Sequence, residues 1–229
     1  MSLTRIQEYQ VNTTQTGITD NLAVMNQAQT GANTNDIGFV MDRGSLPNVA
    51  LIWNEANGAF RLAVTSTTAT TPTANIAVIS NAPLMTGQLY ISNGNFSTDG
   101  DAISAAYIQR NITSTNTPTP LYTNGLSQEL IVTLNSLWTF DITVSAIRTD
   151  AVDYASFKIL GAVTCGATAA SISLLGTPST TVIGHTDSTW TASTSVDTAR
   201  GALVTTVTGA TGKTIRWVAN ILTTEVAIA

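Results

Sequence analysis

Seven residues from Trp138 to Val144 decide the fold class, and they read Trp-Thr-Phe-Asp-Ile-Thr-Val. Successive side chains of a β-strand point to opposite faces, so this alternation predicts a strand with one buried and one solvent-facing side. We expect the aromatic and aliphatic residues to face a core, and Thr139, Asp141 and Thr143 to face away from it.

Shorter stretches of the same kind lie on both sides of this strand and are separated by turn residues. Strands that recur roughly every 8–14 residues are typical of a β-sandwich or jelly roll. No helical period of ten or more residues follows position 36, so we predict an all-β protein. The expected strands cover residues 37–41, 49–53, 60–64, 76–79, 89–91, 106–108, 130–134, 157–160, 171–174, 181–183, 203–207 and 214–221.

The strand pattern divides the chain into three parts. Residues 1–35 are polar and read as an arm that anchors the protein or contacts another subunit. Residues 36–86 are predicted to form a small β-meander, with a turn at Asn57-Gly58, followed by a Thr-rich connector. Residues 87–229 are predicted to form a β-sandwich or jelly-roll-like domain, whose last two strands are joined by a hairpin loop at Gly209–Gly212.

The chain carries unusually little charge for its 229 residues. Only 10% of the residues are charged and the net charge is −5, whereas about forty are threonine. Its few cationic residues include just two lysines, Lys158 and Lys213. They form no basic patch that could bind nucleic acid or an anionic membrane surface. An uncharged polar surface of this kind favours self-association in a large assembly.

Cysteine and histidine each occur once, as Cys165 and His185. A single thiol cannot form an internal disulfide, and four-ligand zinc sites need clusters that this sequence lacks. We expect Cys165 to pack as a small hydrophobic residue and His185 to lie at the surface or cap a turn. No cofactor and no metal site are expected.

Two pairs of acidic residues are the candidates for catalysis. Asp99 and Asp101 are separated by a glycine, and Asp150 and Asp153 lie three residues apart. Paired carboxylates serve glycoside hydrolysis, but both pairs stand in turn contexts, where aspartate caps backbone amides. We therefore predict structural roles for all four and assign no catalytic, cofactor-binding or metal residue.

The four tryptophans could stack on a sugar or pack in a core. Trp53, Trp138 and Trp217 are in phase with apolar strand neighbours, which favours core packing. Trp190 stands among polar residues and is the better candidate for an exposed contact.

Neither the polar first ten residues nor any later stretch is apolar enough for a signal peptide or a membrane span. The sequence therefore predicts a protein that is made in a cytoplasm and kept there at first. Proteins of tailed-phage virions fit this expectation, because the particles assemble in the host cytoplasm and leave by lysis.

Several stretches resemble virion proteins. Residues 36–44, 48–55 and 58–62 are similar to a segment of cyanophage-type virion structural and fibre proteins. Residues 201–219 resemble the C-terminal β-sandwich of phage tail-fibre and related proteins, and residues 1–35 are unmatched. The first segment commonly recurs in long fibre chains but occurs once here, which favours a compact appendage or a capsid decoration.

The resemblance implies a non-enzymatic virion structural protein, a homotrimer that forms a tail fibre or similar appendage. Its partners would be other copies, other virion proteins and a host surface glycan or protein, with no nucleic acid and no insertion into a membrane. The alternative is a capsid decoration or cement protein that uses residues 1–35 as a strap. A remote alternative is a small glycan depolymerase that acts through one of the two aspartate pairs.

Overall fold

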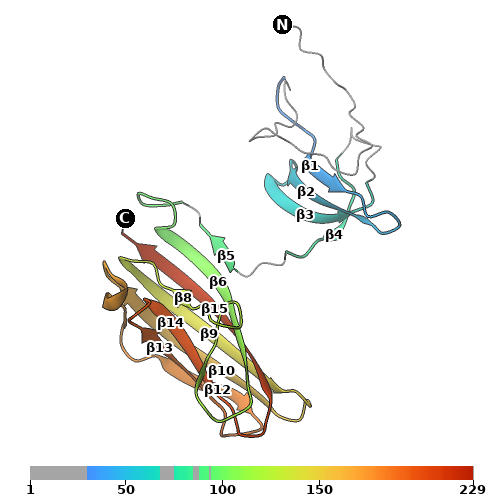
Figure 1. The fold of residues 1–229 in the computed structure, drawn as a ribbon. Helices are drawn as coiled ribbons and strands as arrows, with labels where there is room; N and C mark the ends of the chain where they lie inside the picture. Colours follow the sequence, from blue (N-terminus) through green and yellow to red (C-terminus); the bar gives the residue numbers. More distant parts are fainter. Residues whose placement is uncertain (1–29, 68–74, 85–87, 93, 229) are drawn as a thin grey trace. The chain divides into compact units, whose positions relative to one another are not determined.

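The computed structural model describes residues 30–67, 75–84, 88–92 and 94–228 (Figure 1). The chain divides into two compact units between Met85 and Thr86. The paired strands of both units are antiparallel, which confirms the all-β prediction. Residues 1–29 of the predicted arm lie outside the described residues.

The N-terminal unit contains one sheet, in the strand order β1-β2-β3-β4. Its strands are β1 (Ile37–Met41), β2 (Asn48–Asn54), β3 (Ala59–Thr65) and β4 (Val78–Asn81). The first three agree with the predicted meander, and the last begins two residues later than expected. Gly58, at the end of the β2–β3 turn, has a φ of 58°, a conformation that favours glycine.

One face of this sheet is buried, and it is not the face that holds Trp53, which the sequence predicted to be a core residue. Ala50, Ile52, Ala63 and Thr65 are buried on one side. The opposite side carries the larger residues but is half-buried or exposed, and Trp53 on it is only half-buried, not a core residue. This apolar face consists of Ile37, Phe39 and Met41 from β1, Val49, Leu51 and Trp53 from β2, and Phe60, Leu62 and Val64 from β3.

Polar contacts explain why the side with the smaller residues is the covered one. The Asp36 carboxylate accepts hydrogen bonds from the Asn54 side-chain amide at 2.9 Å and from the Ile76 backbone amide at 3.1 Å. The Thr65 hydroxyl donates to the Ala77 carbonyl oxygen at 2.8 Å. Neighbouring segments are thus tied to the face that holds the two alanines, because small side chains let backbone approach closely.

The C-terminal unit is built on a seven-stranded sheet in the order β11-β10-β9-β15-β6-β5, with β12 also paired to β10. The alternation predicted for residues 138–144 is confirmed, because Trp138 and every second residue after it as far as Val144 are buried. The strands are β5 (Gln88–Ile91), β6 (Ala102–Thr113), β9 (Ser136–Arg148), β10 (Tyr154–Cys165), β11 (Ser173–Leu174), β12 (Ser179–His185) and β15 (Ile215–Ala227).

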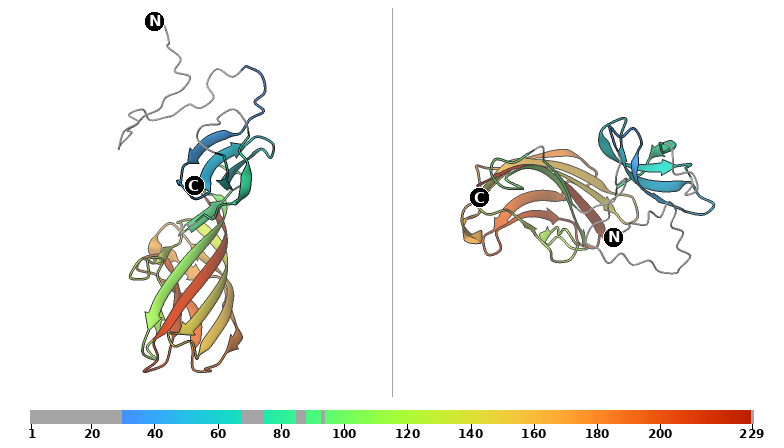
Figure 2. Two further views of the ribbon diagram at one scale, coloured as in Figure 1. Left: turned by 90° about the vertical axis from the view of Figure 1, so that its right-hand side faces the viewer. Right: turned by 90° about the horizontal axis from the view of Figure 1, so that it is seen from above.

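A smaller sheet forms the second layer, and the right-hand view of Figure 2 shows the two layers facing one another. Residues of both sheets, including Trp217 and Ile142 from the larger and Leu203 and Val207 from the smaller, share one buried core. The predicted β-sandwich is therefore confirmed. The strands of the smaller sheet are β7 (Thr119–Pro120), β8 (Leu130–Ile131), β13 (Thr191–Asp197) and β14 (Ala202–Thr208).

The structure corrects three local predictions. Residues 171–174 form the end of a short 3-10 helix, η1 (Ala169–Ser171), and the two-residue strand β11. β13 was not predicted because serine and threonine fill most of its positions. The loop at Gly209–Gly212 is not a hairpin, because β14 pairs in the smaller sheet and β15 pairs in the larger, so the loop crosses between layers.

Candidate functional site

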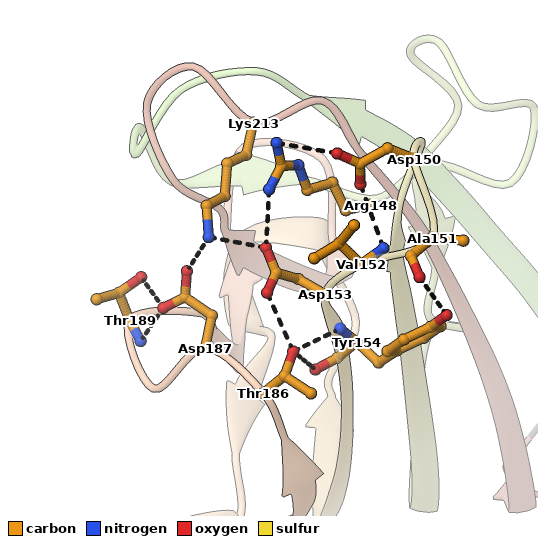
Figure 3. A network of polar contacts seen from close by, with 10 residues as sticks. All are labelled: Arg148, Asp150, Ala151, Val152, Asp153, Tyr154, Thr186, Asp187, Thr189 and Lys213. Carbon is orange, nitrogen blue, oxygen red and sulfur yellow. Dashed lines mark hydrogen bonds and ion pairs between the residues drawn. The ribbon is translucent and has the colours of Figure 1, made fainter.

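A network of ion pairs lies at the end of the sandwich where β15 begins (Figure 3). Nζ of Lys213 lies 2.8 Å from a carboxylate oxygen of Asp153 and 2.8 Å from one of Asp187. Nη1 of Arg148 lies 3.2 Å from the same oxygen of Asp153. The network joins the β9–β10 turn, the loop after β12 and the segment that leads into β15.

The electrostatics of this network suit a structural clamp. Hydrogen bonding to Lys213 lowers the pKa of Asp153 and that of Asp187, and Thr189 lowers the pKa of Asp187 further. The two carboxylates raise the pKa of Lys213 in turn. Groups held in their ionised forms by paired charges cannot readily donate or accept protons near neutral pH.

The remaining candidate aspartates have the turn roles that the sequence predicts. Asp150 accepts a hydrogen bond from the Val152 amide at 3.3 Å and also pairs with Arg148 at 3.0 Å. Asp101 is buried and accepts three backbone amides, those of residues 96, 97 and 98, at 2.7–2.9 Å. These amide hydrogen bonds lower the pKa of Asp101. Asp99 accepts the side-chain amide of Asn95 at 2.8 Å.

Cys165 and His185 lie far apart and cannot form a catalytic pair. Cys165 is buried at one end of β10, as predicted for a packed thiol. His185 is exposed and pairs with Ala155 at the other end of β10, about 30 Å away along a strand that rises roughly 3.3 Å per residue. It lies in a strand and not in the predicted turn.

The prediction of an exposed contact at Trp190 is wrong. Its side chain is only 1% exposed and its ring centroid lies 5.7 Å from that of Trp217. Trp190 directly precedes β13, so it shares the buried side with Ala192, whereas Thr191 and Ser193 face outward. Trp138 and Trp217 are buried as expected.

A cleft of about 660 Å³ opens at the other end of the sandwich, where β15 ends. Tyr90 forms part of its rim and is 54% exposed, whereas Tyr107 and Trp138 are almost completely buried beneath it. Glu129 and Glu225 also line the cleft. Concave sites with aromatic walls and a few polar groups are where proteins most often bind small ligands.

Glu225 is the polar centre of this cleft. Its Oε1 accepts hydrogen bonds from the Tyr107 hydroxyl at 2.9 Å and from the Thr223 hydroxyl at 2.5 Å. Burial raises the pKa of Glu225, and these two hydrogen bonds oppose the shift. Burial also raises the pKa of Tyr107, so its phenol stays protonated and continues to donate.

The residues that line this cleft are widely separated along the chain, so local sequence patterns do not identify it. Tyr107 and Glu225 are 118 positions apart and meet only because β6 pairs with β15. The sequence does contain one signal of the cleft. Glu225 lies an even number of residues from Trp217 and Ile221 in the same strand, so its acidic side chain points to the core side.

Neither a cluster of potential metal ligands nor a membrane-spanning helix is found among the described residues. None of its histidine, cysteine, aspartate and glutamate residues form a group of three that could hold a metal ion. Over the same residues, no helix is long and apolar enough to cross a membrane.

Comparisons with known proteins give one structural likeness. No protein-family model and no curated protein matches the chain. Among solved structures, the fold is similar to a tailspike protein of Acinetobacter baumannii bacteriophage Fri1, described as a capsular polysaccharide depolymerase, with 12% identity and a TM-score of 0.35. The match covers 64% of this chain and 22% of the tailspike chain, and a likeness at this level does not extend to function.

Proposed function

We propose that this chain is a non-enzymatic structural protein of a tailed-phage virion that forms a surface appendage for host contact. The apolar face of the N-terminal sheet carries the proposal, because a contiguous apolar surface of a few hundred Å² often marks an interaction site. The segments that resemble virion proteins and the low charge support the same function.

The apolar face is continuous over three neighbouring strands. Phe39 and Met41 of β1, Leu51 of β2 and Phe60 of β3 are all exposed, and Phe60 reaches 79%. Strands about 4.8 Å apart and seven residues long give a face of roughly 300 Å² in plan. Removing such a surface from water favours association.

The partner on this face is proposed to be the same face of other copies. All nine of its side chains are uncharged, and the one polar side-chain group among them, the indole N–H of Trp53, already donates to Glu55 at 3.0 Å, so contact between identical faces leaves no polar side chain of the face unpaired. On the buried side of the sheet, only Ala50, Ile52 and Ala63 are fully buried apolar residues among those described, which is little core for an independent unit. We propose a trimer, with the N-terminal unit for assembly and the sandwich for contact.

The sandwich suits the contact role because its own core is complete. Its two layers bury three tryptophans, so loops and the cleft can vary without loss of the fold. The clamp at Lys213 fixes the loops at one end, and the open cleft lies at the other end.

Antibody labelling of purified phage particles that encode this chain tests the proposal. Label on the tail or its appendages is the expected result. Dense label over the head would favour the capsid decoration over the appendage. Absence of the protein from washed particles would overturn the virion role. Release of reducing ends from host polysaccharide by the purified protein would contradict the non-enzymatic part.

A further inference from the structure

The cleft where β15 ends gathers negative charge in a chain that has little charge. Asp99, Glu129 and Glu225 all line it, and the described residues of its lining include no lysine, arginine or histidine. Glu129 pairs with Arg200 from outside this lining, where Nη1 of Arg200 lies 3.7 Å from Oε1 of Glu129 and the Arg200 side chain is 60% exposed. Such an exposed contact neutralises the carboxylate only weakly.

One carboxylate oxygen that lines this cleft is buried and has no hydrogen-bond partner among the described residues. It is Oε2 of Glu129. Glu225 is only 5% exposed, and the hydrogen bonds that it accepts from Tyr107 and Thr223 both end on Oε1. A buried carboxylate oxygen without a donor is costly, so Glu129 favours a ligand that brings positive charge and N–H donors.

The aromatic wall of the cleft favours the same kind of ligand. The ring of Tyr107 stacks on Trp138 with centroids 6.0 Å apart and meets Tyr90 edge to face at 5.8 Å. Tyr107 and Trp138 are each only 2% exposed, so Tyr90, which is 54% exposed, is the ring of this wall that can offer its face to a ligand. Aromatic faces attract organic cations. An exposed aromatic ring together with the unpartnered carboxylate oxygen of Glu129 suits an ammonium group.

We propose that this cleft binds an organic ammonium group, presented as the free amine of an amino sugar in a host surface glycan. The choice of a sugar rests on the proposed host-contact function, whereas the choice of an ammonium group rests on the cleft alone. The volume of about 660 Å³ admits a sugar ring. Ser92, Gln128 and Thr133, which also line the cleft, supply hydrogen-bonding groups for its hydroxyls.

Titration of the purified full chain with three monosaccharides tests this inference. Glucosamine carries an ammonium group, N-acetylglucosamine carries a neutral amide on the same carbon, and glucose carries a hydroxyl there. We expect glucosamine to bind at least about tenfold more tightly than the other two, as measured by ligand-observed NMR. Equal binding of all three, or no binding of glucosamine, would overturn the ammonium site.

Glu225→Gln is the decisive variant because its amide oxygen can still accept from Tyr107 and Thr223. It should fold normally and lose the preference for glucosamine, and Glu129→Gln should weaken it. Asp141→Asn is the matched control, since this carboxylate pairs with Lys158 at 2.9 Å and does not line the cleft. An unchanged preference in both glutamine variants would overturn the assignment.

The two proposals can fail separately. If antibodies detect the protein on phage particles but it binds glucosamine no better than glucose, the appendage proposal stands and the ammonium site is rejected. If the protein prefers glucosamine but is absent from phage particles, the ammonium site stands and the virion role is rejected.

Discussion

The ammonium group of Lys213 lies 2.8 Å from Oδ2 of Asp187 and ties the start of β15 to the loop after β12. The pKa of Asp187 is lowered, so its contribution to stability is complete above its unfolded pKa of about 3.9 and is lost as the pH falls through the folded value. The raised pKa of Lys213 adds stability below about pH 10.4, which is lost as the pH rises through its folded value.

Lys213→Met should therefore lower the melting temperature at neutral pH and reduce its fall on acidification. The substitution leaves Asp153 and Asp187 without their shared cation and keeps the length of the side chain. Thermal unfolding between pH 2 and pH 7 measures both effects. Lys158→Met is the control, because Lys158 belongs to an exposed pair with Asp141, and a loss equal to that of Lys213→Met would contradict the clamp.

Gly161→Ala should destabilise the sandwich by about 1–3 kcal/mol. An added Cβ at this position would lie 2.6 Å from Cζ of Phe140 and 3.2 Å from Cβ of Pro178, so the buried ring would have to move. Urea unfolding gives the change in free energy. Gly184→Ala in β12 is the matched control, since its Cβ would meet nothing within 4 Å, and it should be near neutral.

Trp190→Ala should cost about 3–5 kcal/mol of stability, because it opens a cavity against Trp217. Phe96→Ala removes another aromatic ring, one that is 79% exposed, and should change stability by less than about 0.5 kcal/mol. Chemical denaturation of both variants separates the two environments. Full stability in the Trp190 variant would restore the surface role that the sequence suggested.

Leu51→Glu should dissociate the assembly proposed for the apolar face. Leu51 lies in the central strand of that face between Phe39 and Leu62, so a glutamate there would place like charges together in every copy. Light scattering should change from the mass of three chains to that of one, 23.9 kDa.

Leu175→Glu is the control for that experiment, because Leu175 is an equally apolar, exposed residue of the C-terminal unit. Its assembly should match that of the unsubstituted protein. A monomeric unsubstituted protein would rule out the interface altogether.

The sandwich could be predicted from the sequence where alternation is long and one side of a strand is strongly apolar. In β9, large apolar residues alternate with threonine and Asp141, so side-chain period and burial agree. β13 could not be predicted in this way, because serine and threonine fill most of its positions and no alternation of apolar and polar residues is visible. Its strand forms through pairing with β14.

The N-terminal sheet shows a different limit of sequence reasoning. Alternation identifies two faces but does not say which one another part of the molecule covers. The phase of Trp53 with its apolar neighbours predicted that it would be buried, whereas the covered side is the one that holds Ala50 and Ala63. A partner outside the single chain is a physical reason for large side chains on an exposed face.

The candidate cleft was beyond sequence reasoning because strand register creates it. Pairing of β6 with β15 brings Tyr107 near Glu225, and no local spacing records that pairing. The threonines show the same dependence on tertiary context. Many face outward as expected, but Thr65, Thr113, Thr205 and Thr223 are buried.

The position of β15 has a consequence for synthesis. It is made after all the other described strands, yet it lies in the middle of the larger sheet, between β6 and β9. Until it arrives, those two strands lack a partner along edges of more than ten residues. Closure of this sheet therefore waits until β15 has been made, and a nascent chain that stops before residue 215 cannot complete the sandwich.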